Sequence, residues 1–261
     1  MTRKILITGA TDGIGLLTAR KLAAAGHQVL IHGRSQAKLS AAADEIGTVE
    51  TYLADFSRLG EVAAMARTIR DQHDRLDVVI NNAGVLKSAT ARTESGRDIR
   101  FEVNTLAPYL LTRSLLPIIP PEGRIVNLSS AAQARVDVAS MTDYRPMDDM
   151  SAYAQSKLAL TIWSAEMAGE HPDGPVIVAV NPGSLLASKM VREGFGLHGN
   201  DLNVGADILI RAAVSDEFKE ASGQYFDNDS GAFAAPDAAA LDATHTAEVM
   251  AAITSILDTT P

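Results

Sequence analysis

Two residues of this chain have types and a spacing that suit acid–base catalysis. Tyr153 and Lys157 are four positions apart, which places both side chains on one face of a helix. A free tyrosine has a pKa of about 10, and a neighbouring ammonium lowers that pKa by favouring the phenolate. The pair could therefore exchange a proton with a substrate near neutral pH. A chance pairing is the alternative, because this spacing alone is not specific.

Other polar residues stand where a predicted strand or helix would present them to a ligand. Ser129 and Ser130 follow the predicted strand at residues 124–128, where a hydroxyl could hydrogen-bond a substrate oxygen. A turn or a helix cap is the commoner use of such a serine pair. Asn104 lies inside a predicted helix at residues 95–116. Asparagine is a poor helix former, which is consistent with a polar role, and an ordinary surface position is the alternative.

A glycine-rich turn, T-G-A-T-D-G-I-G at residues 8–15, joins the first predicted strand to the first predicted helix. Glycines in such a turn let the backbone approach a pyrophosphate, and the helix N-terminus adds free N–H groups. An ordinary tight turn is the alternative. The residues expected to contact a dinucleotide here are Gly9, Thr11, Asp12, Gly13, Ile14 and Gly15.

The end of the second predicted strand indicates which dinucleotide binds. Gly33 and Arg34 stand where an acidic residue would bind the ribose 2′-hydroxyl of NAD. A guanidinium suits the 2′-phosphate of NADP, and the missing carboxylate removes a repulsion. Asp12, inside the glycine turn, argues in the other direction. We therefore expect NADP, with NAD as the alternative.

Short apolar runs alternate with helical patterns along the chain, and these elements must position the polar residues. Strands are predicted at residues 4–8, 28–32, 50–54, 77–81, 124–128, 176–180 and, more weakly, 224–227. Helices are predicted at residues 14–25, 36–46, 59–73, 95–116, 151–169, 204–214 and 247–257. Strands that are apolar on consecutive positions indicate a sheet covered on both faces. The alternation predicts an α/β fold: one Rossmann domain over residues 1–261, with a doubly wound parallel sheet of about seven strands and helices on both faces.

Three segments fall outside this regular alternation. Residues 131–150 and 184–203 each follow a predicted strand, and we expect them to form a wall and a lid of the substrate site. Their apolar side chains favour a substrate with an apolar portion. The third segment is the tail at residues 227–261. It opens with D-N-D, which resembles a calcium loop but lacks the closing acid, so we expect a turn and no metal site.

Composition excludes several classes of function. The chain has 261 residues and a net charge of −9, which argues against nucleic acid or an anionic membrane as a partner. It contains no cysteine, which excludes disulfides, zinc–thiolate sites and a cysteine nucleophile and fits a reducing compartment. No apolar run approaches the roughly 18 residues of a membrane span. These features predict a cytoplasmic protein.

Taken together, these residues resemble the short-chain dehydrogenase/reductase family over nearly the whole chain. Residues 8–15 match its TGxxxGxG turn, Asp55 and Phe56 its Asp-apolar pair near adenine, and residues 82–84 its Asn-Ala-Gly motif. Pro182 and Gly183 match the turn after its sixth strand. The long interval between Ser130 and Tyr153, with Y-A-Q-S-K-L-A at residues 153–159, is similar to members such as retinol dehydrogenases and protochlorophyllide reductases.

The resemblance implies a catalytic tetrad and a mechanism. The nicotinamide would give a hydride to a carbonyl carbon or take one from an alcohol, with Tyr153 as general acid or base. Lys157 would lower the pKa of Tyr153 and hold the nicotinamide ribose, Ser130 would bind the reacting oxygen, and Asn104 would position a water. The further cofactor contacts that it implies are Asp55, Phe56, Asn82, Ala83, Gly84, Tyr153, Lys157, Pro182, Gly183, Leu185 and Ser188. It also implies a small-molecule substrate and a homodimer or homotetramer.

Two other functions stay open on the sequence. The chain could be a dinucleotide-binding sensor without turnover, although such relatives typically lack the tyrosine or the lysine. It could also be an enzyme of the same family that acts on an activated double bond or as an epimerase, because the tetrad serves more than one substrate.

Overall fold

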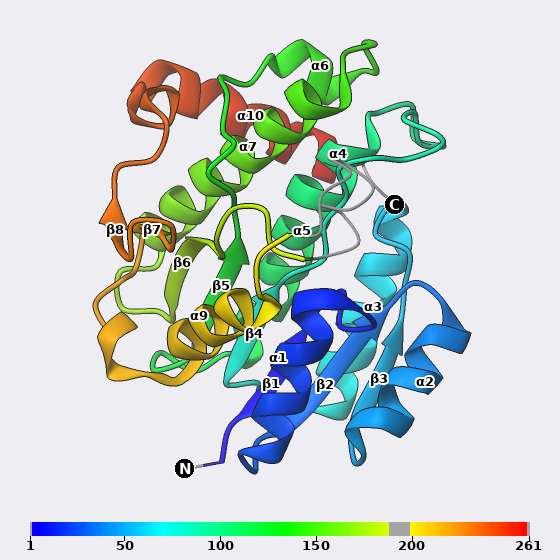
Figure 1. Cartoon of the computed structure of the whole chain (residues 1–261). Helices are drawn as coiled ribbons and strands as arrows, with labels where there is room; N and C mark the ends of the chain where they lie inside the picture. The colour runs from blue at the N-terminus through cyan, green and yellow to red at the C-terminus, as the bar shows by residue number, and fades with distance from the viewer. Residues whose placement is uncertain (1, 188–198, 260–261) are drawn as a thin grey trace.

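The computed structural model describes residues 2–187 and 199–259. These residues form one eight-stranded sheet in the order β3-β2-β1-β4-β5-β6-β7-β8 (Figure 1). The strands are β1 Lys4–Ile7, β2 Gln28–Gly33, β3 Glu50–Leu53, β4 Val78–Asn81, β5 Arg124–Leu128, β6 Val176–Asn181, β7 Tyr225–Asp227 and β8 Ala232–Ala234. All neighbouring pairs up to β7 are parallel, and β8 is antiparallel to β7. The predicted α/β fold with a parallel sheet is confirmed.

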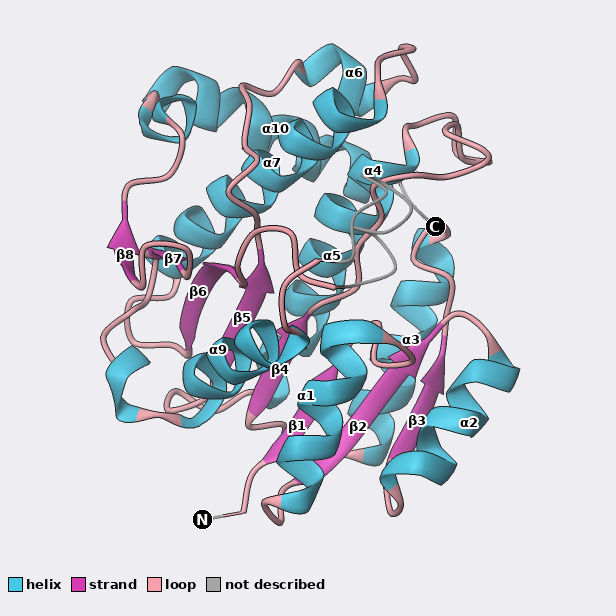
Figure 2. Cartoon of the chain, viewed as in Figure 1, coloured by secondary structure: helices cyan, strands magenta, loops and turns pink. Residues whose placement is uncertain are grey.

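Helices cover both faces of this sheet (Figure 2). They are α1 Gly13–Ala24, α2 Gln36–Ile46, α3 Leu59–Gln72, α4 Ile99–Phe101, α5 Ala107–Leu115, α6 Val138–Thr142, α7 Asp149–Glu170, α9 Leu202–Val214 and α10 Ala243–Asp258. Side chains of α1, α2 and α9 belong to one buried apolar cluster, and those of α3, α5, α7 and α10 belong to another.

The two clusters lie on opposite faces because side chains alternate along a strand. In β1, Leu6 packs with the α3–α5–α7 cluster, whereas Ile5 and Ile7 pack with the α1–α2–α9 cluster. All three are fully buried. This explains why the strands are apolar at consecutive positions in the sequence.

The strand order places a crevice at the carboxyl edge of the sheet. From β1 the chain runs outward through β2 and β3, and then crosses to the other side of β1 to form β4 and β5. Such a reversal separates the loops that follow the two central strands, and ligands of open α/β sheets bind there. The glycine turn follows β1, and the Asn-Ala-Gly motif at residues 82–84 follows β4.

Two differences from the predicted elements have local causes. The helix predicted from residue 95 begins only at Ile99, because residues 93–97 form a turn with Gly96 at φ +85° and Asp98 caps the helix by accepting from the Arg100 N–H. The helix then passes through a π-helical segment, Glu102–Leu106, before α5. The sheet also has one strand more than the seven expected. Residues 228–231 form the predicted turn, which reverses the chain so that β8 pairs with β7.

The predicted wall and lid are described to different extents. The wall at residues 131–150 is described throughout and contains α6. Of the lid at residues 184–203, residues 188–198 lie outside the described part of the chain. In the parts on either side, Leu186 bridges Asn200, so the two ends of this segment meet.

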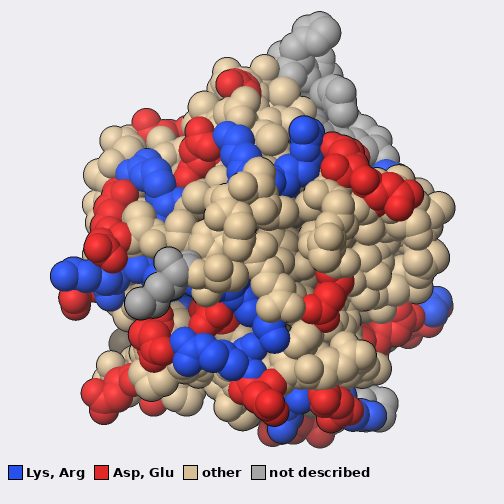
Figure 3. Space-filling model, turned by 90° about the horizontal axis from the view of Figure 1, so that it is seen from below, with Lys and Arg blue, Asp and Glu red and all other residues tan. Residues whose placement is uncertain are grey.

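The distribution of surface charge and the length of the helices are relevant to the partners considered above, namely nucleic acid, membranes and metal ions. On the face seen from below, acidic and basic side chains are interspersed (Figure 3). Within residues 2–187 and 199–259, no helix is both long and apolar enough to cross a membrane. The same residues contain no group of three or more histidine, aspartate or glutamate side chains placed to hold a metal ion.

Candidate active site

A cleft of about 590 Å³ opens at the carboxyl edge of the sheet. Most of the predicted cofactor residues line it, namely Gly9, Thr11, Asp12, Gly13, Ile14, Gly15, Gly33, Arg34, Asp55, Phe56, Asn82, Ala83, Gly84, Tyr153, Lys157 and Pro182. Gly183 and Leu185 are described but do not border the cleft. Ser188 lies outside the described residues. Loops after β1, β2 and β4 and the first turns of α7 thus converge on one space.

The glycine turn after β1 fits a dinucleotide. A Cβ on Gly9, whose φ is +65°, would lie 2.8 Å from the Ala83 Cα, and one on Gly15 would lie 2.4 Å from the Asn82 Nδ2. That amide holds the turn by donating to the carbonyl oxygens of Thr8 (2.8 Å) and Gly9 (3.0 Å). The turn is therefore closed by backbone packing that only glycine allows. A pyrophosphate needs this arrangement of bare backbone at a helix N-terminus.

The charged residues near the end of β2 differ in whether they have partners within the protein. Asp12 caps α1 by accepting from the Gly13 N–H at 2.8 Å, and its carboxylate lies 4.0 Å from the Lys38 Nζ. Arg34 is exposed and forms no hydrogen bond or ion pair with any residue that the structure describes. The acid that argued against NADP thus serves a helix cap beside a lysine, whereas the arginine beside the cleft is unpaired.

Tyr153 and Lys157 lie one turn apart on α7 and both border the cleft. The Lys157 Nζ lies 5.6 Å from the centre of the Tyr153 ring and donates to the Leu128 carbonyl at 2.6 Å. Burial lowers the pKa of Lys157 to about 7. Burial raises the pKa of the Tyr153 hydroxyl, and a hydrogen bond with Ser130 partly opposes that change.

In the free protein, Lys157 is not among the groups that shift the pKa of Tyr153. The ammonium points to a backbone carbonyl rather than to the phenol oxygen, so loss of solvent dominates the pKa of Tyr153. The free protein at neutral pH holds a neutral phenol next to a lysine that is only partly protonated.

The two serines after β5 face in different directions. The Ser129 hydroxyl is buried and lies 2.6 Å from the Thr161 Oγ1, in the interior, although Ser129 borders the cleft. The Ser130 side chain instead hydrogen-bonds Tyr153. Its hydroxyl oxygen also accepts from the Ala132 N–H at 3.1 Å. Of the two serines, Ser130 is thus the one whose hydrogen bond affects the pKa of the Tyr153 hydroxyl, whereas Ser129 is the one among the residues that line the cleft.

Asn104 lies in the π-helical segment and is fully buried. Its Oδ1 accepts from the Val85 N–H at 2.8 Å, and its Nδ2 donates to the Val85 carbonyl and to the Ser156 hydroxyl, each at 2.9 Å. A Cβ on Gly84 would lie 3.4 Å from the Asn104 Oδ1 and 3.6 Å from the Lys157 Nζ. The asparagine side chain thus joins the loop after β4 to α7, and π-segments often occur at such functional positions.

Comparison with known proteins identifies the family. A model described as short chain dehydrogenase matches residues 3–195. The chain belongs to the short chain dehydrogenase family. Human retinol dehydrogenase 13 is 30% identical, over 90% of this chain and 79% of that protein. A protein of Streptomyces sp. (strain C5), named as a daunorubicin C-13 ketoreductase, is 31% identical, over 86% of this chain and 82% of its own length.

Solved structures agree with this assignment. A crystal structure of an uncharacterized protein from Mycobacterium paratuberculosis has a TM-score of 0.83 and 28% identity, covering 99% of this chain and 95% of that one. A protein from Shigella flexneri described as a short chain dehydrogenase, complexed with NADP, has a TM-score of 0.68 and 27% identity, covering 87% and 96%. The predicted family and enzyme class are confirmed, and a nicotinamide cofactor is supported.

This short chain dehydrogenase also supports its glycine turn with a residue that the sequence analysis missed. His32, at the end of β2, accepts from the Gly9 N–H at 3.2 Å on Nδ1, and its Nε2 lies 3.0 Å from the Ala54 carbonyl. Its ring stacks on Phe56 with centres 4.1 Å apart. Burial lowers the pKa of His32 to about 4, so the ring is neutral at pH 7. The signal in the sequence was a lone histidine directly before Gly33.

The hairpin of β7 and β8 supports the site from the other side. The Ser130 carbonyl accepts from the Tyr225 hydroxyl at 3.0 Å and from the Gln133 Nε2 at 2.9 Å. Asp229, in the hairpin turn, accepts from the N–H of Ser184 at 2.8 Å and from its hydroxyl at 2.5 Å. The turn that was predicted at this position therefore fixes the chain directly after Gly183.

Proposed function

We propose that this short chain dehydrogenase transfers a hydride between NADP(H) and a carbonyl or secondary alcohol substrate that has an apolar portion. Two observations carry this proposal: Tyr153 and Lys157 border the same cleft as the glycine turn, and the Tyr153 hydroxyl has a hydrogen bond with Ser130. Bound at that turn, the nicotinamide cofactor supplies or accepts the hydride. The residues of the chain orient the substrate and move the proton.

The states of the side chains favour carbonyl reduction. The Ser130 and Tyr153 hydroxyls together can bind the reacting oxygen as it gains negative charge. An ordinary tyrosine, with a pKa of about 10, is already neutral at pH 7, and burial raises the pKa of Tyr153 further, so its hydroxyl holds a proton that it can donate to that oxygen. Oxidation needs the phenolate instead, and would therefore run better at higher pH.

The choice of NADP rests on the end of β2. Arg34 forms no ion pair within the described residues and borders the cleft together with Ser35 and Lys38. A guanidinium and an ammonium suit the dianionic 2′-phosphate. The NADP complex of the Shigella flexneri protein supports the same choice.

An apolar portion of the substrate is supported by the lining of the cleft. That lining includes the apolar side chains of Val85, Leu86, Ile99 and Val103. The names of two relatives, a retinol dehydrogenase and a daunorubicin ketoreductase, also point to substrates with apolar rings or chains. A cytoplasmic location and a homodimer or homotetramer remain part of the proposal, the former supported by the absence of cysteine.

Fluorescence titration with NADPH and NADH, followed by a carbonyl reduction assay, tests the proposal. We expect NADPH to bind at least tenfold more tightly than NADH, and Arg34→Ala to remove most of that preference without changing NADH affinity. Tyr153→Phe should keep NADPH affinity within twofold and lose nearly all turnover. Equal affinity for the two cofactors would refute the NADP assignment, and an active Tyr153→Phe enzyme would refute the role of the phenol.

A further inference from the structure

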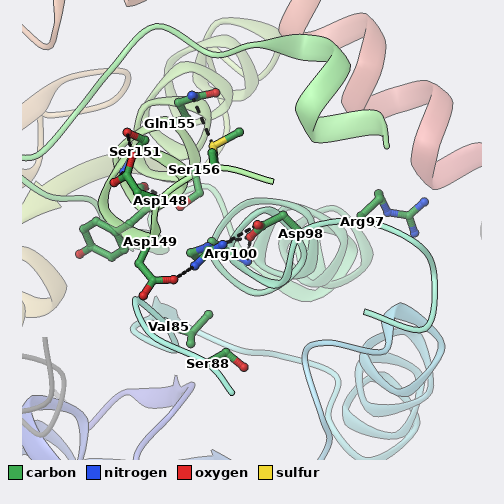
Figure 4. Close-up of polar contacts among 12 residues, drawn as sticks. Val85, Ser88, Arg97, Asp98, Arg100, Asp148, Asp149, Ser151, Gln155 and Ser156 are labelled. Atoms are coloured by element: carbon green, nitrogen blue, oxygen red, sulfur yellow. Dashed lines mark hydrogen bonds and ion pairs between the residues drawn. The ribbon is translucent and has the colours of Figure 1, made fainter. Parts of the chain in front are cut away.

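Arg100 is a buried cation between the elements that carry the site. Its side chain is 1% exposed and contacts two carboxylates, that of Asp98 beside it and that of Asp149 in the first turn of α7 (Figure 4). The Nε lies 2.7 Å from the Asp98 Oδ1, and one amino nitrogen lies 2.5 Å from the Asp98 Oδ2. The other amino nitrogen contacts Asp149 and lies 3.4 Å from the Leu86 carbonyl oxygen.

Arg100 remains charged although it is buried. Burial alone would lower the pKa of Arg100, but the hydrogen bonds and charges of Asp98 and Asp149 raise it. Burying such ions is unfavourable, and apolar side chains of similar shape often give equal or higher stability. What a guanidinium adds is a rigid, planar set of donors that fixes its partners in one geometry.

The cluster joins the loop after β4, which lines the cleft, to α7, which carries Tyr153. Asp149 precedes Tyr153 by four residues, so both lie on the same face of α7, one turn apart. Leu86 follows Val85, whose backbone is held by Asn104. One helical turn along α7, Ser156 accepts from Asn104 and donates to the Tyr153 carbonyl at 2.7 Å. These contacts form a second link between the loop after β4 and α7. The Arg100 contact lies at the N-terminal end of α7.

We propose that Arg100 and Asp149 are positioning residues, whose contact fixes the first turns of α7 so that the Tyr153 hydroxyl stays in place against Ser130. The inference rests on the proposed function for its catalytic consequence. It does not rest on that function for its structural part, which concerns the free protein.

Asp149→Asn is the variant that separates this role from folding. Asp149 is 42% exposed, so its replacement places no unpaired polar group in the interior. Arg100 keeps its bidentate partner Asp98 and therefore stays paired. Asp148→Asn is the matched control, because it removes the same charge one residue away. Asp148 accepts from the Ser151 N–H at 2.9 Å and does not touch Arg100, and asparagine also caps helices well. Asp149→Glu tests rescue by a carboxylate.

Two measurements distinguish the outcomes. The first is hydrogen–deuterium exchange of residues 151–157 in the free proteins. The second is steady-state reduction of 4-nitrobenzaldehyde with NADPH and with NADPH deuterated at the transferred position. For Asp149→Asn we expect exchange about tenfold faster and kcat about tenfold lower, with a larger isotope effect and NADPH affinity within twofold. Asp148→Asn should match the wild type within twofold, and Asp149→Glu should recover most of kcat.

Other results overturn the proposal. Unchanged exchange and kcat in Asp149→Asn, or equal changes in Asp148→Asn, would mean that the contact positions nothing. Faster exchange with unchanged kcat and isotope effect would reduce Arg100 to a structural residue. If the wild type reduces no carbonyl, the proposed function fails, and the exchange comparison alone decides whether the contact holds α7.

Discussion

Replacing Lys157 with methionine should stabilise the free protein at neutral pH and abolish its turnover. The Lys157 side chain is 3% exposed, and its pKa falls from 10.5 to about 7 on folding. The folded protein therefore binds this proton less tightly than the unfolded chain does. Stability rises with pH between about 7 and 10.5 and is lost as pH falls through that range.

The size of the effect follows from the pKa difference. The weaker proton binding of Lys157 in the folded protein lowers the free energy of unfolding by about 4 kcal/mol at pH 7 and by about 2 kcal/mol at pH 9. Methionine also leaves the Leu128 carbonyl without its donor, which costs about 1 kcal/mol. We therefore expect Lys157→Met to be more stable than the wild type by about 3 kcal/mol at pH 7 and by about 1 kcal/mol at pH 9.

Urea unfolding of the cofactor-free proteins at pH 7 and pH 9, at one protein concentration, measures this difference. Lys219→Met, at an exposed lysine, is the control and should change little at either pH. A Lys157→Met protein that is less stable at pH 7, or whose advantage does not shrink by pH 9, would refute the reasoning. Retained turnover would refute a catalytic role for Lys157.

Three further perturbations test the supports of the site. Tyr225→Phe should lower kcat about threefold to tenfold, because it removes a donor to the Ser130 carbonyl. Tyr52→Phe is the control, because this buried tyrosine is not among the residues that line the cleft, and it should lower only the free energy of unfolding, by about 1 kcal/mol. Gly15→Ala should weaken NADPH binding at least tenfold in fluorescence titration, with the circular dichroism spectrum unchanged, because its Cβ would lie 2.4 Å from a side-chain nitrogen after β4. Because the pKa of His32 is about 4 in the folded protein, the unfolded chain takes up this proton at higher pH than the folded protein does. The free energy of unfolding should therefore fall by about 3 kcal/mol as the pH is lowered from 6.5 to 4, and urea unfolding of His32→Asn should not show this loss.

The fold followed from the sequence because its strands are buried on both faces. Ile5, Leu6 and Ile7 must all lie in apolar surroundings, and only a sheet between two helical layers provides them. The start of the helix before Asn104 did not follow in the same way. A side-chain cap at Asp98 and a π-helical segment depend on single hydrogen bonds that hydrophobic periodicity does not report.

The site was predictable where a motif fixes local backbone and not where distant segments meet. The glycine turn was found because Gly9 and Gly15 are required by contacts with the chain at residues 82–83, and glycine spacing records that requirement directly. Tyr225 was not found as a support of Ser130, because the two residues are far apart in the sequence and any buried tyrosine gives the same local pattern. The contact of the Lys157 Nζ with the Leu128 carbonyl could not be predicted for a related reason, since strand β5 and helix α7 meet only in the folded chain.

The two buried cations near Tyr153 show how the fold assigns different tasks to similar charges. Arg100 has two carboxylate partners, so it stays ionised and can hold two elements in a fixed geometry. Lys157 hydrogen-bonds a backbone carbonyl and has no carboxylate partner among the described residues, so burial brings its pKa to about 7 and leaves its charge responsive to a ligand. A carboxylate beside Lys157 would raise that pKa again and fix the charge, as it does for Arg100. We therefore expect that an acidic side chain placed next to Lys157 would impair the site. An ammonium that already has a carboxylate partner could not change its protonation when a cofactor binds.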